Sequence, residues 1–513
     1  MNNQTHEALF EEYKDGRTLD KLQKYALWTI SSAFPDTGNQ RNLQGDISVE
    51  QDYQSIGAIL VNYLAAKLAG LLFPVTQSFF KIQPTPVLLS LASQQFGVEA
   101  KEVQNRLIKL ENEACAALYK NASYAQLVQM LRYLIITGNA MFKRIDGRLT
   151  VYSLRNYSQL RDNEGNLLDA ILRESWAYNS LPESVRPLAN LPVGADEFAP
   201  IDVYTRIKRV RKADKTVYEV SQEIGGKSLG KASEYPEHLC PYQTVVWNII
   251  NGDSNGRGLV EDHAGDFAKL SDLSRALAVY EINSCRVVNL VKPGATVDIE
   301  ALNTAYCGEF VQGDPGNINA LESGDAQKIQ QLASEIQAIF QRLAMAFMYQ
   351  GNTRDAERVT AEELRLNAQE AENALGGQYS QLSQGIHLPL SHLLCMEVSP
   401  NFITALVAGE LTLDVITGLP ALGRSTVVTQ LLQAIQELSL IIPAMKQLSP
   451  RFDTEAVIDT VLQARGVNLD DTMFSAEELQ AQQDEMQAQQ AQQQAMMGGG
   501  ASPEVAQTIQ GII

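Results

Sequence analysis

Two glycine-rich stretches contain residue types that could hold a nucleotide phosphate. Gly418 to Ser425 (GLPALGRS) has the glycine spacing of a phosphate-binding loop, and Leu411 to Thr417 before it could form the preceding strand. That loop type needs a lysine for the terminal phosphates and backbone N–H groups around the others, but Arg424 replaces the lysine and Pro420 removes one N–H. We therefore favour a connection between two helices over a nucleotide site.

The second stretch, Gly225 to Ala232 (GGKSLGKA), lacks the hydroxyl that would hold magnesium and follows a predicted hairpin. We interpret it as a loop. His387 and His392 lie five residues apart, whereas metal ligands on one helix face are spaced by three or four residues. No Gly-x-Ser-x-Gly elbow or acid–base constellation is present. The sequence thus predicts a protein that is not an enzyme and has no cofactor or metal.

The five cysteines are scattered without a close pair, which predicts reduced, buried thiols in a cytoplasmic protein. One segment, Ile56 to Val75, is apolar enough to be considered as a membrane span, but Asn62 and Lys67 interrupt it. A lysine in mid-bilayer costs about 3 kcal/mol, so a helix buried in a large core is the better interpretation. The N-terminus is polar and acidic, with no secretory signal. A soluble protein without a membrane partner is expected.

Composition limits the classes of partner. The chain has 513 residues, 45% hydrophobic and 20% charged, with a formal net charge of −19. This length predicts several domains or one elaborated fold. A sequence-specific DNA-binding protein would present a basic face, which this charge disfavours. A conduit for DNA remains compatible, because a channel through which a polyanion slides should not grip its phosphates.

The elements that must position any functional side chain centre on residues 325 to 396. Asp325 to Met348 has an apolar stripe at helical spacing and predicts a rod of about 36 Å. A polar break follows at Tyr349 to Arg358, and Thr360 to Glu363 has the pattern of a capping box. A second, longer helix then continues to Met396, interrupted by Gly376-Gly377.

The chain before this region predicts helices to about residue 135 and hairpins after it. The expected helices are Asp20–Phe34, Ile56–Phe73, Ala100–Tyr119 and Tyr124–Ile136. The expected hairpins are Ala140–Leu149, Val151–Leu160 with Leu167–Glu174, and Ile201–Val210 with Thr216–Ile224. The strand that starts at Ile201 carries five cations: Arg206, Lys208, Arg209, Arg211 and Lys212. We favour the solvated face of an exposed hairpin, with contact to DNA or to an acidic neighbouring subunit as the alternative.

From Leu259 an apolar helical stripe predicts a long helix that runs to Val291 and stops at Pro293-Gly294. Two long helices therefore flank an insertion of about thirty residues, Ala295 to Gly324, rich in Gly, Asn and Asp. Residues 401–474 are expected to be helical with short breaks. The remaining segment is Gln/Ala/Met-rich and acidic, and its composition permits a partly disordered tail, a coiled coil or a helical barrel.

Several stretches together resemble one protein family. They are Asp52–Gln54, Leu72–Pro74, Thr137–Asn139, Tyr235–Tyr242, Gly256–Gly258, Gly308–Gly313, Glu357–Arg365, Leu375–Gln384 and Leu388–Leu390. In their order along the chain they resemble the head-to-tail connector (portal) proteins of T7-like short-tailed bacteriophages. None of them is a catalytic signature.

The resemblance implies an α+β fold, predominantly α, with several domains. They are a wing (1–258), a first stem helix (259–291), a clip (292–324), a second stem helix (325–349), a channel loop (350–358), a long wing helix (359–400), a crown (401–474) and a C-terminal helix, barrel or tail (475–513). It further implies a closed ring, a homododecamer, at one vertex of the virion, assembled in the host cytoplasm.

The function implied by the family is a passive channel for packaging and ejecting double-stranded DNA, which also helps to nucleate procapsid assembly. Expected partners are the terminase large subunit, major capsid and scaffolding proteins, tail adaptor and tail tube proteins, internal core proteins, and DNA bound without sequence preference. The rival hypotheses are an unrelated α+β scaffold or envelope-associated structural protein and, third, a nucleotide-binding enzyme.

The same resemblance assigns roles to two groups of residues. In the channel loop, Asn352, Thr353, Arg354 and Arg358 would face the DNA backbone. Without the resemblance we would favour a solvated turn between helices, with Arg354 paired to Asp355 or Glu357. In the clip, Glu309, Gln312 and Asp314 would contribute to docking of the motor and the tail.

Overall fold

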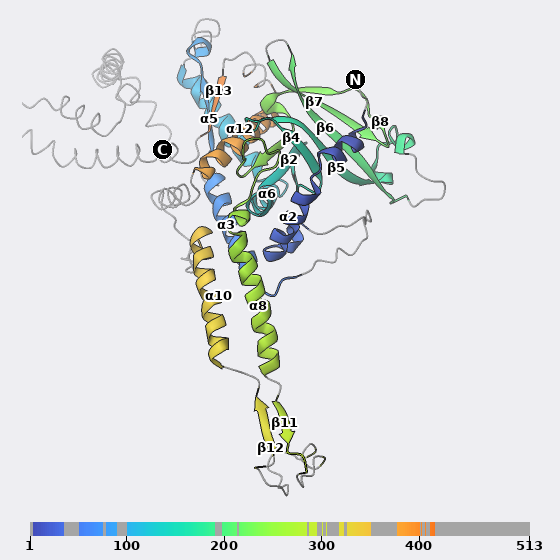
Figure 1. The fold of residues 1–513 in the computed structure, drawn as a ribbon. Helices are drawn as coiled ribbons and strands as arrows, with labels where there is room; N and C mark the ends of the chain where they lie inside the picture. Colours follow the sequence, from blue (N-terminus) through green and yellow to red (C-terminus); the bar gives the residue numbers. More distant parts are fainter. Residues whose placement is uncertain are drawn as a thin grey trace, which may run out of the picture. The chain divides into compact units, whose positions relative to one another are not determined.

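A computed structural model describes most of the first 415 residues (Figure 1). The described ranges are 4–34, 51–74, 78–89, 100–189, 197–212, 215–284, 287–294, 318–322, 326–349, 377–400 and 411–415, with single residues at 300, 304, 316, 402 and 406. The chain divides into two compact units, 1–419 and 420–513. The second unit lies entirely outside the described residues.

The N-terminal part is helical, as predicted. Its helices are α1 His6–Tyr13, α2 Gly16–Trp28, α3 Ile56–Leu72, α5 Ala100–Leu118 and α6 Ser123–Thr137. Helix α3 packs against α6, and its side chains Leu60, Leu64 and Leu68 have no exposed area. Helix α3 is therefore a core helix, because its apolar side chains pack against apolar side chains of the same protein and not against lipid. Among the described residues, no helix combines the length and hydropathy that a membrane span requires.

Two antiparallel sheets follow, and the predicted hairpins form them. A three-stranded sheet has the order β10-β2-β3, with bounds β2 Asn139–Ile145, β3 Arg148–Tyr152 and β10 Tyr242–Val246. Asp146 and Gly147 form its turn, with φ of 49° and 72°, the left-handed pair that a two-residue hairpin turn needs. The other sheet has the order β4-β5-β6-β7-β8, and β9 also pairs with β7.

The bounds in this second sheet are β4 Tyr157–Arg161, β5 Leu167–Ala177, β6 Pro200–Lys212, β7 Lys215–Ile224, β8 Lys227–Ser228 and β9 Ser233–Pro236. Short 3-10 turns occur at Ser31–Ala33, Tyr178–Ser180, Arg186–Ala189 and Glu237–Leu239.

Carboxylates of the same chain neutralise much of the basic strand β6. Arg206 contacts Asp169 at 2.5 Å, and Lys212 contacts Glu234 at 2.5 Å. Arg209 lies 3.3 Å from Glu237. These ion pairs agree with the structural interpretation of the basic strand better than with contact to DNA.

A small sheet joins distant parts of the chain. Strand β1, Phe80–Pro84, pairs antiparallel with β13, Leu411–Val415. The helical prediction for 401–474 is wrong at Leu411–Val415, where only the alternative of a strand before a phosphate-binding loop had been considered, and no strand was predicted at β1. The alternation Leu411, Leu413, Val415 favours a strand, and β1 supplies its hydrogen-bonding partner. A phosphate-binding loop follows a strand of a parallel sheet, so the antiparallel pairing of β13 disfavours a nucleotide site after it.

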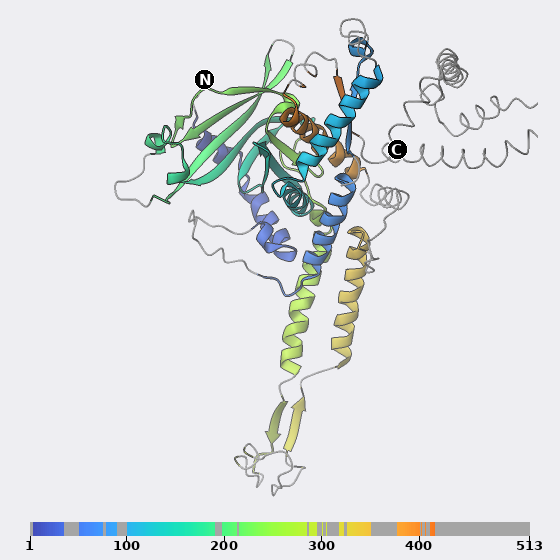
Figure 2. The same cartoon turned by 180° about the vertical axis from the view of Figure 1, so that it is seen from behind.

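The two long helices and their insertion are the elements that bear on function. Helices α7 Leu259–Asp262 and α8 Ala264–Ser284 lead into strand β11, Val287–Val291, which pairs with β12, Ile318–Glu322. Helix α10, Ala326–Ala346, then returns alongside α8 (Figure 2). The prediction of a helix from 259 to 291 is wrong at Val287–Val291, which form a strand. β-Branched Val287, Val288 and Val291 favour a strand, and β12 supplies the hydrogen-bonding partner.

The long wing helix predicted for 359–400 is described only from Gly377. There α12, Gln378–Val398, begins after Gly377, whose φ of 88° lies in the left-handed region. The predicted capping box at 360–363 lies outside the described residues.

Candidate functional site

The residues proposed from sequence lie outside the described part of the chain. This holds for the channel-loop residues Asn352, Thr353, Arg354 and Arg358. It also holds for the clip residues Glu309, Gln312 and Asp314. The structure does describe the elements on either side of both segments, namely α8 and α10 with the β11–β12 hairpin. We therefore examine how those elements are held.

An apolar seam joins α8 to α10. The rings of Phe267 and Phe347 meet edge to face with centroids 5.7 Å apart, and both side chains are fully buried. Ile339 and Leu343 continue the buried stripe along α10. A T-shaped aromatic pair adds about 0.5–1.5 kcal/mol to the free energy gained by burying its area. The seam matches the apolar stripe predicted from the sequence.

Two exposed ion pairs border this seam. Arg342 Nη2 lies 2.7 Å from Asp266 Oδ1, and Lys269 pairs with Glu335. The guanidinium of Arg342 donates to Asp266 and holds the pKa of that carboxyl below its usual value. Solvent screens such pairs, so we expect them to set the register of the antiparallel helices more than their stability.

Residues of the Asp52–Gln54 stretch anchor α8 to the body of the subunit. The hydroxyl of Ser271 donates to Asp52 at 2.7 Å, and the guanidinium of Arg275 lies 5.9 Å from the ring centroid of Tyr53. Gln54 continues the connection inward, because its amide donates to the carbonyl of Trp28 at 2.6 Å. Helix α8 is thus fixed by the side chains of residues 52–54 and, separately, by the apolar seam with α10.

The chain leaves α10 at Tyr349, immediately before the predicted channel loop. The Tyr349 ring packs against Tyr63 of α3 at 5.1 Å and against Phe340 at 5.9 Å. Met348 has a φ of 52°, so the helix ends by a left-handed turn that brings Tyr349 back onto α3. The starting point of the loop is therefore fixed by aromatic packing.

Two stretches that carry the family resemblance meet at a buried hydrogen-bonded node. The Asn139 amide donates to the carbonyl of Gly256 at 2.8 Å and its Oδ1 accepts from the Gly256 N–H at 2.7 Å. Glycine is required on both sides, since a Cβ on Gly138 would lie 2.3 Å from the Arg257 carbonyl carbon and one on Gly258 would lie 2.6 Å from the Ile135 oxygen. Thr137–Asn139 and Gly256–Gly258 thus join the start of β2 to the loop before α7.

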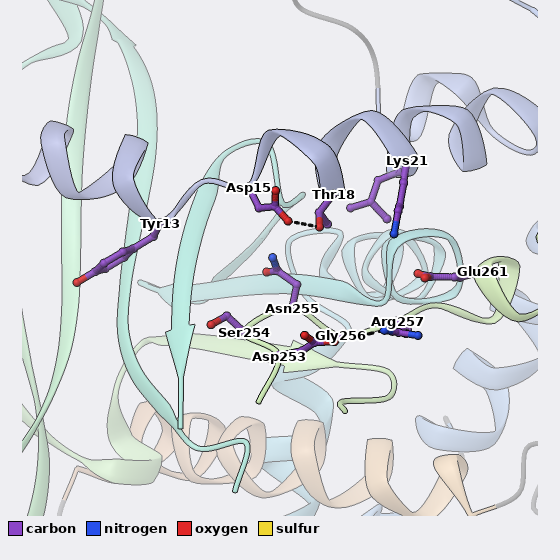
Figure 3. A pocket seen from close by; sticks show the side chains of 11 residues that line it. Tyr13, Asp15, Thr18, Lys21, Asp253, Ser254, Asn255, Gly256, Arg257 and Glu261 are labelled. Carbon is purple, nitrogen blue, oxygen red and sulfur yellow. Dashed lines mark hydrogen bonds and ion pairs between the residues drawn. The ribbon is translucent and has the colours of Figure 1, made fainter. Parts of the chain in front are cut away.

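A polar cavity of about 370 Å³ lies beside this node (Figure 3). Thr18 and Lys21 of α2, with its N-cap residue Asp15, form one wall, and Asp253 to Arg257 form much of the other. Glu261 adds a carboxylate, so three acidic and two basic side chains line the cavity. This mixture favours neither an anionic nor a cationic ligand.

His387 and Cys240 are both buried, and burial makes each of them less reactive. Within the described residues, no three His, Cys, Asp or Glu side chains gather closely enough to hold a metal ion. His387 is fully buried between Phe73 and Phe79, at ring distances of 4.8 and 4.9 Å, and burial lowers its pKa to about 3. Burial likewise raises the pKa of the Cys240 thiol to about 12, so this sulfur is not a nucleophile at neutral pH.

Of the two glycine-rich stretches considered as phosphate-binding loops, Gly225 to Ala232 begins with a turn. Gly225 and Gly226 connect β7 to β8 with φ of 54° and 77°. Gly418 to Ser425 lies outside the described residues.

Local patterns did not predict which residues connect the elements. Asn139 and Gly256 were noted only as parts of separate stretches, because their partners lie 117 residues apart. One signal was present for the ion pairs. Glu335 and Arg342 are seven residues apart and therefore lie on the same edge of α10.

Comparisons with known proteins agree along nearly the whole chain. The family described as bacteriophage head to tail connecting protein matches residues 16–472. The portal protein of Pseudomonas phage phiKMV is 37% identical over 484 residues, covering 94% of each chain. The portal protein of Escherichia phage T7 is 29% identical over 494 residues, covering 93% of this chain and 89% of that protein.

Among solved structures, a chain from the neck of an empty gene transfer agent particle aligns with a TM-score of 0.32 and 13% identity, covering 65% of this chain and 79% of that one. A similarity at this level supports no inference about function.

Proposed function

Because the chain belongs to the bacteriophage head to tail connecting protein family, we propose that it assembles into a closed ring of twelve copies at one vertex of a phage capsid. The ring is a passive channel for double-stranded DNA during packaging and ejection. It helps to nucleate the procapsid with major capsid and scaffolding proteins. It docks the terminase large subunit first, and later the tail adaptor and tail tube proteins, with internal core proteins on the capsid side.

The observation that best supports this proposal is the helix pair with its insertion. Helices α8 and α10 pack against each other and, at one end, against the body of the subunit, while much of the rest of each helix surface is exposed. Val279 and Ile282 on α8 are 48% and 62% exposed, and Met345 on α10 is 72% exposed. Neighbouring copies would cover such apolar groups, and cyclic closure avoids an open filament.

Within this proposal, the domains keep the bounds predicted from the sequence, except that β11 is moved from the first stem helix to the clip. Residues 1–258 form the wing, 259–284 the first stem helix and 285–324 the clip, which now includes β11. Residues 325–349 form the second stem helix, 350–358 the channel loop, 359–400 the long wing helix, 401–474 the crown and 475–513 the C-terminal helix, barrel or tail. Assembly takes place in the host cytoplasm before the ring becomes part of the virion.

Ring formation is tested by electron microscopy of the purified protein at low and physiological salt. Each copy carries a formal charge of −19, so screening should favour association as ionic strength rises. A chain that stays monomeric at micromolar concentration in both conditions would overturn the proposal.

The channel loop is tested by deleting residues 350–357 and, separately, by Arg354→Ala. Tyr349 already fixes the end of α10, so the deletion should leave rings intact and impair packaging completion or genome retention. Arg354→Ala removes one phosphate contact per copy and should make any binding of DNA in the ring slightly weaker and less dependent on salt. Full packaging and retention by the deleted particle would refute the assignment of this loop.

The clip is tested by reversing charge at Glu309 or Asp314 and by Gln312→Ala. Rings should persist, while attachment of terminase or tail proteins weakens, as measured by co-sedimentation. If the same substitutions abolish rings, this segment is a subunit interface and not a docking surface.

A further inference from the structure

The sequence contains two Asn-Gly pairs, Asn251-Gly252 and Asn255-Gly256, and both lie in the loop between β10 and α7. An asparagine side chain cyclises when the backbone nitrogen of the next residue attacks its amide carbon. Glycine as the next residue favours this reaction, because it has no Cβ to obstruct the approach and its backbone is flexible. The two pairs therefore have the same chemistry available, and their surroundings in the fold distinguish them.

Asn251-Gly252 lies at the exposed tip of the loop. Asn248 and Arg257 close the loop at its base, where the Arg257 N–H donates to the Asn248 carbonyl at 2.7 Å. At the tip, the Asp253 N–H donates to the carbonyl three residues before it at 2.9 Å, so Asn251 and Gly252 are the central residues of a turn. Both are exposed. Among the residues that the structure describes, none accepts the Gly252 N–H or bonds to the Asn251 side chain.

Asn255-Gly256 is held on both sides. The Gly256 N–H, whose nitrogen would have to attack, is buried and donates to Asn139 Oδ1 at 2.7 Å. The Asn255 side chain is half-buried and accepts from Gln159 at 3.3 Å. Both residues of this pair lie in the wall of the polar cavity (Figure 3). Cyclisation here requires that Gly256 first give up its bond to Asn139.

We propose that Asn251 is a site of spontaneous covalent modification in the folded protein, and that the fold protects Asn255 from the same reaction. The Gly252 nitrogen loses its proton and bonds to the amide carbon of Asn251, and ammonia leaves, which gives a five-membered succinimide. Water then opens this ring at either carbonyl and yields aspartate or isoaspartate. Water is the only other reactant. The reaction does not depend on assembly of the chain into a ring.

The product differs from asparagine in charge and in length. A neutral amide becomes a carboxylate, which adds one negative charge to the formal net charge of −19. Isoaspartate also adds one carbon atom to the backbone of the turn, which disrupts the hydrogen bond made by the Asp253 N–H. The change should remain at the tip of the loop, because the hydrogen bonds of Gly256 and Arg257 hold its base.

Peptide mass spectrometry of the purified full-length protein tests the inference. Samples are held at mildly alkaline pH, folded or in guanidinium chloride, and fragment spectra follow the replacement of NH2 by OH at residues 251 and 255. Each folded rate is compared with the rate of the same pair in the unfolded chain, so that the effect of neighbouring sequence cancels. Folding should slow Asn255 by roughly five- to a hundredfold more than Asn251, since the buried Gly256 N–H must first lose its partner. Slowing of Asn251 that equals or exceeds that of Asn255 would overturn the inference.

Two substitutions at the exposed tip complete the test. Asn251→Gln should nearly stop the reaction at position 251, because glutamine must close a larger and less favoured ring, while the rate at Asn255 stays the same. A rate at position 251 that this substitution leaves unchanged would contradict cyclisation. Asn251→Asp reproduces one of the two products and should unfold at the same temperature as the wild-type protein. A lower unfolding temperature would contradict a change confined to the tip of the loop.

Discussion

Replacing Asn139 with alanine should release the loop that precedes α7 from the rest of the body. The Asn139 side chain is fully buried, and its amide group satisfies both the N–H and the carbonyl of Gly256, which is also buried. Alanine provides neither donor nor acceptor. Each buried group left without a partner costs about 1–3 kcal/mol, so two of them cost about 2–6 kcal/mol. That is a large fraction of the roughly 5–15 kcal/mol by which a domain is stable.

Hydrogen exchange followed by mass spectrometry measures this effect within the assembled protein. Amides in the segment from Trp247 to Gly258 should exchange faster by a factor between about thirty and twenty thousand, since 1.4 kcal/mol corresponds to tenfold. Asn255→Ala is the matched control, because Asn255 lies in the same loop, is half-buried and accepts only one hydrogen bond, at 3.3 Å from Gln159. It should change the same amides by less than tenfold. Unchanged exchange in Asn139→Ala would refute the argument that this node holds the loop.

Three further substitutions test other parts of the structure. Arg342→Glu places a second carboxylate beside Asp266, so the yield of rings in electron micrographs should fall at low salt. Adding Asp266→Arg restores an ion pair and should restore the yield. A double variant that forms no more rings than Arg342→Glu would contradict a direct pairing of the two residues. Gly138→Ala should abolish soluble protein, because the φ of Gly138 is 74° and the new Cβ would lie 2.3 Å from a backbone carbon. The control is Gly385→Ala in α12, where the new Cβ meets nothing within 4 Å. This control should raise stability in thermal unfolding by up to about 1 kcal/mol. Burial lowers the pKa of His387 to about 3, so as pH falls the imidazole is protonated in the unfolded chain before it is protonated in the folded one. The free energy of unfolding from urea titrations should therefore decline by roughly 4 kcal/mol between pH 6.5 and 3. The variant His387→Leu should lack this contribution to the pH dependence.

Local periodicity was sufficient for elements whose partners are close in sequence. The helix predicted at Ala100–Tyr119 is α5, and the hairpin predicted from Ile201 is β6 with β7. The pattern failed at Val287–Val291, where a short run with four apolar residues fits a helix or a strand equally well. Only pairing with β12 decides between them, and that partner lies beyond the insertion.

The sites illustrate the same limit. Sequence resemblance singled out Thr137–Asn139 and Gly256–Gly258 without indicating that they touch, since a hydrogen bond across 117 residues leaves no local pattern. The proposed channel and clip residues rest on that resemblance and stay predictions.

The pairing of β1 with β13 has a consequence for the time course of biosynthesis. Thr412 donates to the carbonyl of Gln83, which is 329 residues earlier in the chain. At the usual rate of synthesis, roughly 15 to 65 s pass between the two residues leaving the ribosome. During that interval β1 has an open edge that could pair with another nascent chain. Pairing with β13 closes that edge, so β1 gains its protecting partner only after residue 415 has left the ribosome.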